Sequence, residues 1–168
     1  SVHARDLPES VSRLQMQLRD TARQLEHALK DLYRYQAEAM YDSAEPAGES
    51  GIRVVSWAST DGHDIGYLKM VAHEICQHPS TVALLGSSNG ESAHVVFEKS
   101  HDVSIDMAKL LREVLPSVDG KGGGTHQIAQ GGGRRPDRLP YAISLAAEMV
   151  SKAVAGIEAE TAASADRH

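Results

Sequence analysis

The feature that most constrains the fold of this chain is a glycine-rich stretch from Asp119 to Gly133. It holds seven of the fourteen glycines in the sequence. Glycine allows backbone angles that other residues avoid and lets a second molecule come close to the bare main chain, but ordering it costs more entropy. Such a density therefore predicts a backbone shape that the function requires.

Positive charge gathers around this stretch. From Ser117 to Pro140, four cations face two carboxylates, which leaves a local charge of +2, whereas the whole chain carries −6. A locally positive, glycine-rich surface on an acidic protein predicts an anion site, and the anion could be a nucleic-acid backbone. The residues predicted to form it are Lys121, Gly122, Gly123, Gly124, His126, Gln130, Gly131, Gly132, Gly133, Arg134, Arg135 and Arg138.

Two common phosphate-binding motifs are excluded for this stretch. No Lys-Ser or Lys-Thr pair follows Gly124, so it is not a Walker loop, and no strand with a later acidic residue makes it a dinucleotide-binding turn. The alternative interpretation is that the glycines only form tight turns.

The N-terminal part predicts a long helix over residues 8–40. Apolar or small residues recur at steps of three and four, the heptad pattern of a coiled coil: Val11, Leu14, Leu18, Thr21, Leu25, Ala28, Leu32, Tyr35 and Ala39. Such a stripe needs a partner helix, which could be a second copy of the chain or a helix upstream of this sequence. Its four repeats favour a homodimer over packing on the chain's own globular domain. We therefore expect a coiled-coil dimerisation segment at residues 1–42.

The remainder predicts a linker at 43–50, a globular domain at 51–156 and a disordered tail at 157–168. Strands are expected at 52–57, 81–87 and 92–98, with an Asn89-Gly90 hairpin turn between the last two. Helices are expected at 64–77, at 105–115 with Ser104 as N-cap, and from Pro140 to about Gly156 with Asp137 as cap. Residues 127–130 could add a short strand. The predicted class is α+β, with α/β-like layers: a small mixed sheet packed with helices.

The sequence offers little for catalysis or for metal binding. His73, Cys76 and His78 are too few and too bunched for a zinc site, and we interpret them as a half-buried cysteine between solvent-facing histidines. Ser100, His101 and Asp102 are neighbours in sequence and cannot converge as a catalytic triad. We expect no catalytic residue, metal or cofactor here. No apolar run approaches the roughly 18 residues of a membrane span, so we also expect no membrane contact. The expected location is the cytoplasm.

The two glycine blocks carry a family resemblance. Asp-Gly-Lys-Gly-Gly-Gly at 119–124 and Ile-Ala-Gln-Gly-Gly-Gly at 128–133 resemble the DHH-associated domain that ends alanyl-tRNA synthetases and the long form of alanyl-tRNA editing proteins. Residues 103–116 resemble the editing-protein branch more closely. One departure is Thr125-His126-Gln127, where the family usually has Arg-Pro-Asp or Arg-Pro-Asn.

The resemblance implies a module that binds tRNA, tRNA(Ala) in particular, and dimerises. It also implies that the parent is an aminoacyl-tRNA deacylase whose hydrolytic zinc lies in an upstream domain. The same resemblance leaves open a substrate-binding domain of a DHH-family phosphoesterase that acts on oligonucleotides. A purely structural dimerisation module is the third possibility.

Overall fold

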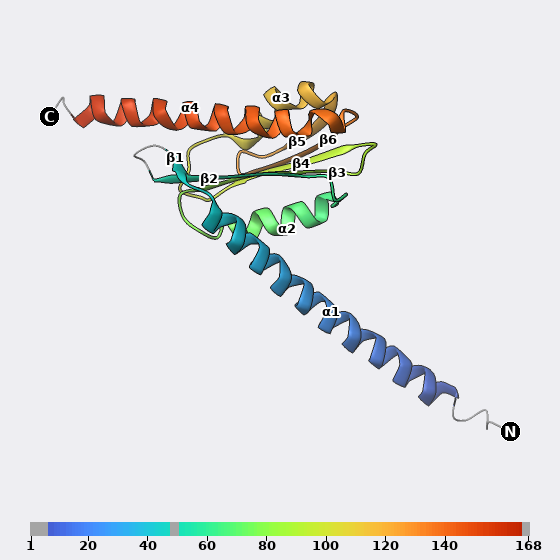
Figure 1. Cartoon of the computed structure of the whole chain (residues 1–168). Helices are drawn as coiled ribbons and strands as arrows, with labels where there is room; N and C mark the ends of the chain where they lie inside the picture. Colours follow the sequence, from blue (N-terminus) through green and yellow to red (C-terminus); the bar gives the residue numbers. More distant parts are fainter. Residues whose placement is uncertain (1–6, 48–50, 166–168) are drawn as a thin grey trace.

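A computed structural model describes residues 7–47 and 51–165. The chain begins with helix α1 (Leu7–Ser43), which projects away from the rest of the molecule (Figure 1). At 37 residues, α1 is about 55 Å long. The predicted long helix is confirmed, and every residue from Leu7 to Leu32 is exposed. Residues 1–6 lie outside the described residues.

A six-stranded mixed sheet forms the centre of the globular part, in the order β1-β2-β3-β4-β6-β5. The pair β2 and β3 is parallel and every other neighbouring pair is antiparallel. The strands are β1 (Pro46–Ala47), β2 (Ile52–Ser59), β3 (Thr81–Ser88), β4 (Ala93–Lys99), β5 (Gly120–Gly124) and β6 (Ile128–Gly133). The expected α+β class is therefore confirmed, with β1 inside the segment expected to be a linker.

Helices cover both faces of the sheet (Figure 1). Helix α2 (Ile65–Ile75) and the end of α1 pack on one face, in a core cluster that includes Leu68, Leu85 and Val96. Helices α3 (Met107–Val114) and α4 (Leu139–Ala165) cover the other face, around Leu84, Phe97 and Ile143. Short 3-10 helices at Leu115–Val118 and Pro136–Arg138 flank the β5–β6 hairpin. No helix within residues 7–47 and 51–165 is long and apolar enough to cross a membrane.

Local sequence explains most of the boundaries. A turn forms at Asn89-Gly90, with Gly90 at a φ of 89°, but Asn89 lacks the positive φ that a mirror-image hairpin turn requires. Helix α3, however, begins later than expected: its N-cap is Asp106, whose side chain accepts a hydrogen bond from the Lys109 amide, and not Ser104. Asp137 likewise does not cap the last helix, because it lies in the 3-10 turn Pro136–Arg138 before α4.

The C-terminal helix is longer than the sequence pattern indicated. Helix α4 continues to Ala165, through much of the segment 157–168 that was predicted to be disordered. The apolar periodicity fades after Val154, but alanine and glutamate favour helix even where no packing surface is present. Residues 166–168 lie outside the described residues.

A cluster of side chains attaches the end of α1 to the sheet. The Arg53 guanidinium lies 4.5 Å from the centre of the Tyr41 ring and donates to the Tyr41 and Ala44 carbonyls. Tyr41 stacks on His78 at 3.9 Å between ring centres, and His78 contacts Glu38 at 3.2 Å. These contacts fix the direction in which the exposed part of α1 leaves the domain.

Candidate nucleic-acid interface

The glycine-rich stretch forms a β-hairpin. Strands β5 and β6 pair from Gly120↔Gly133 to Gly124↔Ala129, and the Thr125 amide donates to the Ile128 carbonyl across the turn. Glycine disfavours strands, so the prediction allowed at most a short strand at 127–130. Pairing of both blocks with each other and of β6 with β4 overrides that preference.

Close packing explains several of these glycines. A Cβ atom on Gly133 would lie 2.2 Å from the Val118 carbonyl oxygen, and one on Gly131 would lie 2.8 Å from the Leu115 side chain. Both residues are buried. Within β5, a Cβ on Gly122 would lie 2.3 Å from the Gln130 carbonyl oxygen, whereas one on Gly123 would meet nothing within 4 Å.

The outer strand of the hairpin is open. Strand β5 is the last strand of the sheet, and its residues from Lys121 to Gly124 are exposed. Among the predicted site residues, His126 is exposed in the turn and Gln130 is exposed on β6. The hairpin thus presents a strip of accessible main chain with Lys121 in it.

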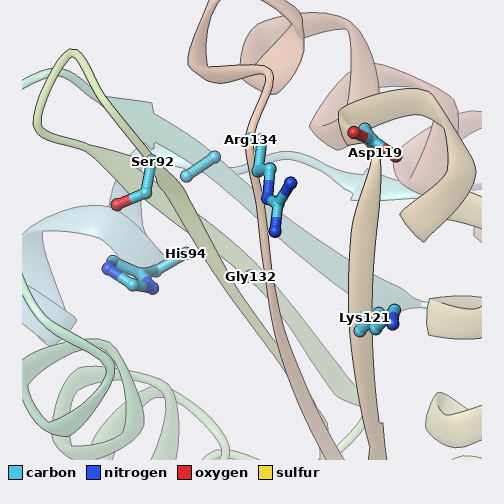
Figure 2. A pocket seen from close by; sticks show the side chains of 8 residues that line it. Ser92, His94, Asp119, Lys121, Gly132 and Arg134 are labelled. Carbon is cyan, nitrogen blue, oxygen red and sulfur yellow. The ribbon is translucent and has the colours of Figure 1, made fainter.

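A depression of about 450 Å³ lies at the end of the hairpin away from its turn, where β4, β5 and β6 meet (Figure 2). Its lining contains four predicted residues, Lys121, Gly132, Gly133 and Arg134, together with Ser92, Ala93, His94 and Asp119. Figure 2 shows Gly132 between His94 on one side and Lys121 on the other. The structure therefore brings the lysine of the first glycine block and the arginine after the second block to one place.

The register of β4, β6 and β5 explains why His94 and Lys121 lie on either side of Gly132. His94 pairs with Gly132, and Gly132 pairs with Lys121. Directly opposed residues in an antiparallel sheet project to the same face, so the two side chains rise from one face across a residue that has none. Neighbouring strands lie about 4.8 Å apart, which separates the His94 and Lys121 main chains by roughly 10 Å.

Ser92 and His94 form the polar side of the depression, and their hydrogen bonds within the protein determine what each can still bind. The Ser92 hydroxyl donates to the Asn89 side-chain oxygen at 3.3 Å, so the lone pairs of Ser92 remain able to accept. His94 is half-buried, and its Nδ1 is buried with no hydrogen-bond partner in the described part of the chain.

Two predicted cations lie elsewhere and are paired. Arg135 Nη2 lies 3.2 Å from the Asp137 carboxylate, and Arg138 Nε lies 3.8 Å from it. The hydrogen bond from Arg135 lowers the pKa of Asp137. Arg135 and Arg138 line no part of the depression. Their positive charge is partly neutralised by the Asp137 carboxylate.

A second depression lies at the C-terminal end of α2, where His73, Cys76 and His78 contribute to its lining. Glu98 is buried, with one oxygen 3.2 Å from His73 Nδ1 and the other without a hydrogen-bond partner in the described residues. Burial raises the pKa of Glu98, against the opposing effect of His73. Burial also raises the pKa of the Cys76 thiol. Within residues 7–47 and 51–165, no three histidine, cysteine or acidic side chains converge to hold a metal.

Sequence reasoning missed Ser92 and His94 as site residues. Ser92 lies in the loop just before β4 and His94 is the second residue of β4, so the two are close in the sequence. Their proximity to Gly132 depends on the pairing of β4 with β6, which no local sequence pattern predicts. Asp119 entered the charge count but was not assigned to the site.

Comparison with known proteins places these features in context. Residues 54–152 match the DHHA1 domain family. Alanine–tRNA ligase from Methanosarcina acetivorans is 33% identical over 155 residues, which cover 91% of this chain and 16% of the ligase. The chain thus spans about one sixth of the length of that relative.

Solved structures agree with the sequence matches. The C-Ala domain from Aquifex aeolicus alanyl-tRNA synthetase superposes with a TM-score of 0.58 and 26% identity, covering 65% of this chain and 98% of that domain. RecJ from Thermus thermophilus in complex with Mn²⁺ superposes with a TM-score of 0.58 and 16% identity, covering 77% of this chain and 18% of RecJ. The second likeness is one of fold. The resemblance predicted from the two glycine blocks is confirmed.

Proposed function

Because the chain belongs to the DHHA1 domain family, we propose that it is a tRNA-binding and dimerisation domain of an alanyl-tRNA synthetase or an alanyl-tRNA editing protein. The relatives described above favour the synthetase over the editing branch that residues 103–116 suggested. The partner under this proposal is tRNA, with tRNA(Ala) the first choice, and the setting is the cytoplasm.

One observation carries the tRNA assignment: Lys121 and Arg134, thirteen positions apart in the sequence, line one open depression floored by glycine. Duplex RNA is recognised mainly through its shape, phosphates and 2′-hydroxyls, and not through base stacking. A glycine hairpin without aromatic side chains suits that mode, because a sugar–phosphate backbone can approach its main chain closely.

In this role the domain binds and orients the tRNA, and the chemical reaction takes place in another part of the protein. In an editing protein, the hydrolytic zinc centre would belong to an upstream domain. The alternative of a phosphoesterase substrate-binding domain is supported by the likeness in fold to RecJ alone.

Dimerisation is proposed through α1. The heptad residues remain uncovered in the single chain, with exposed fractions of 70% for Leu18, 59% for Leu25 and 49% for Leu32. Contiguous exposed apolar surface on a soluble domain marks an interaction site, and a second α1 would cover it in a coiled coil.

The tRNA assignment is tested by measuring affinity for a tRNA(Ala) transcript over a range of KCl concentrations. Replacing Lys121 and Arg134 together by alanine should weaken binding about tenfold and reduce the slope of log affinity against log salt by about two, because each cation releases counterions from a phosphate. A control variant with Arg19→Ala and Lys152→Ala removes the same charge from α1 and α4. If the Lys121/Arg134 variant keeps the circular dichroism spectrum, the tRNA affinity and the salt dependence of the wild-type chain, the assignment is refuted.

A further inference from the structure

The depression beside the hairpin has two chemically different sides. Lys121 and Arg134 supply positive charge on one side, and Ser92 and His94 supply hydrogen-bonding side chains on the other (Figure 2). A site that bound phosphate alone would need only the first side. The second side implies a ligand that carries a polar group next to its anionic group.

The charge of the lining restricts the anion. Lys121 and Arg134 against Asp119 leave a formal charge of +1 in the lining. A phosphodiester carries one negative charge and matches this value, whereas a terminal phosphate carries about −1.5 to −2 at pH 7. The depression therefore suits a phosphate inside a nucleic-acid strand.

The hydrogen-bonding state of the polar side restricts the neighbouring group. Ser92 gives its proton to Asn89 and can accept. His94 Nδ1 is buried without a partner, and a buried N–H without an acceptor is costly, which favours the tautomer that keeps the proton on Nε2. One side chain is then ready to accept and its neighbour to donate.

A hydroxyl group that donates and accepts at once satisfies both. In RNA, the group that combines these properties next to each backbone phosphate is the ribose 2′-hydroxyl, and it is absent from DNA. The floor of the depression leaves room for a sugar, because Gly132 has no side chain and the flanking strands are about 10 Å apart.

We infer that this depression binds one ribonucleotide unit within an RNA strand. The phosphate lies between Lys121 and Arg134, the His94 Nε2–H group donates to the 2′-oxygen, and the 2′-hydroxyl donates to Ser92. This inference rests on the proposed tRNA function and adds to it that the domain selects RNA over DNA through a sugar contact.

The test maps hydroxyl contacts on a tRNA(Ala) transcript that carries 2′-deoxy substitutions at random, about one per molecule. Bound and free molecules are separated after incubation with the full chain, and the substituted positions are compared. With the wild-type chain, deoxy substitution at one or a few positions should weaken binding about threefold to tenfold, the range expected for one or two hydrogen bonds. This signal should disappear in the Ser92→Ala/His94→Ala variant.

The control is His101→Ala/Ser104→Ala, which changes the same residue types at exposed positions outside the depression and should keep the wild-type signal. Ser92→Ala alone should weaken it, and this milder change covers the case in which the double variant does not fold. Salt-dependent binding without any effect of 2′-deoxy substitution would refute the inference and leave the proposed function standing. A deoxy effect that persists in the folded Ser92→Ala variant or in the folded double variant would do the same. No binding of the wild-type chain to the transcript would refute both.

Discussion

Two alanine substitutions within the hairpin should have opposite effects on stability. Gly133→Ala places a methyl group 2.2 Å from the Val118 carbonyl oxygen and 2.8 Å from its side chain, so main chain must move to admit it. Gly123→Ala places a methyl group where nothing lies within 4 Å. The two sites lie on paired strands of one hairpin and differ chiefly in packing.

The magnitudes follow from these distances. Overpacking a well-packed site costs about 1–3 kcal/mol, and Gly133 belongs at the upper end because the closest atom is main chain. At Gly123, alanine restricts the unfolded chain and should stabilise by up to about 0.5–1 kcal/mol. We therefore expect a difference of about 3 kcal/mol in the free energy of unfolding between the two variants.

Urea unfolding followed by the fluorescence of Trp57 provides the assay. Trp57 is the single tryptophan and lies in β2, so its signal follows the sheet and not the exposed part of α1. Equal unfolding free energies for Gly133→Ala and Gly123→Ala would refute the claim that packing requires the second glycine block. A large loss at Gly123 would show that the open edge of β5 is not as the structure describes it.

Two further predictions concern assembly and pH. Leu25→Glu, in the middle of the heptad stripe, should convert a dimer into a monomer in sedimentation velocity, while Met16→Glu, an exposed apolar residue off the stripe, should not; a monomeric wild-type chain, or a dimeric Leu25 variant, would contradict this. Burial raises the pKa of Glu98 above its ordinary value of 4.5, so the folded state holds the proton more tightly than the unfolded chain does. The free energy of unfolding should therefore fall as pH rises from 4.5 through the raised pKa, and urea midpoints should show this fall in the wild type but not in Glu98→Gln.

The elements that could be predicted are those whose signals are local. The heptad steps of α1, the Asn89-Gly90 turn and the β-branched strands β2, β3 and β4 depend on residues close in sequence. The hairpin was missed because its glycines have low strand propensity and gain their order from partners elsewhere, above all from β4 and from the turn Leu115–Val118. No local pattern reports such partners.

The predicted cations of the candidate site also fall into two groups, those that line the depression and those that do not. Lys121 and Arg134 were predicted from composition, and the structure brings them together. Arg135 and Arg138 were predicted with equal force, but Asp137 holds both within 4 Å. Charge counting along the sequence cannot distinguish a free cation from a paired one, because the distinction depends on the conformation of the turn Pro136–Arg138.

The triple glycine at 131–133 serves two requirements that alternate along β6. Gly131 and Gly133 project toward Leu115 and Val118, where a methyl group would collide with packed atoms. Gly132 projects to the opposite face, where a Cβ would lie 3.2 Å from the Ala93 carbonyl oxygen and 3.4 Å from His94 Nδ1 and would begin to fill the depression. If packing against Leu115 and Val118 alone required glycine, position 132 could carry a small side chain after a shift of a few tenths of an ångström at Ala93, and if ligand access alone required it, positions 131 and 133 could carry one. Packing therefore accounts for the glycines at 131 and 133, and the proposed binding site accounts for the glycine at 132.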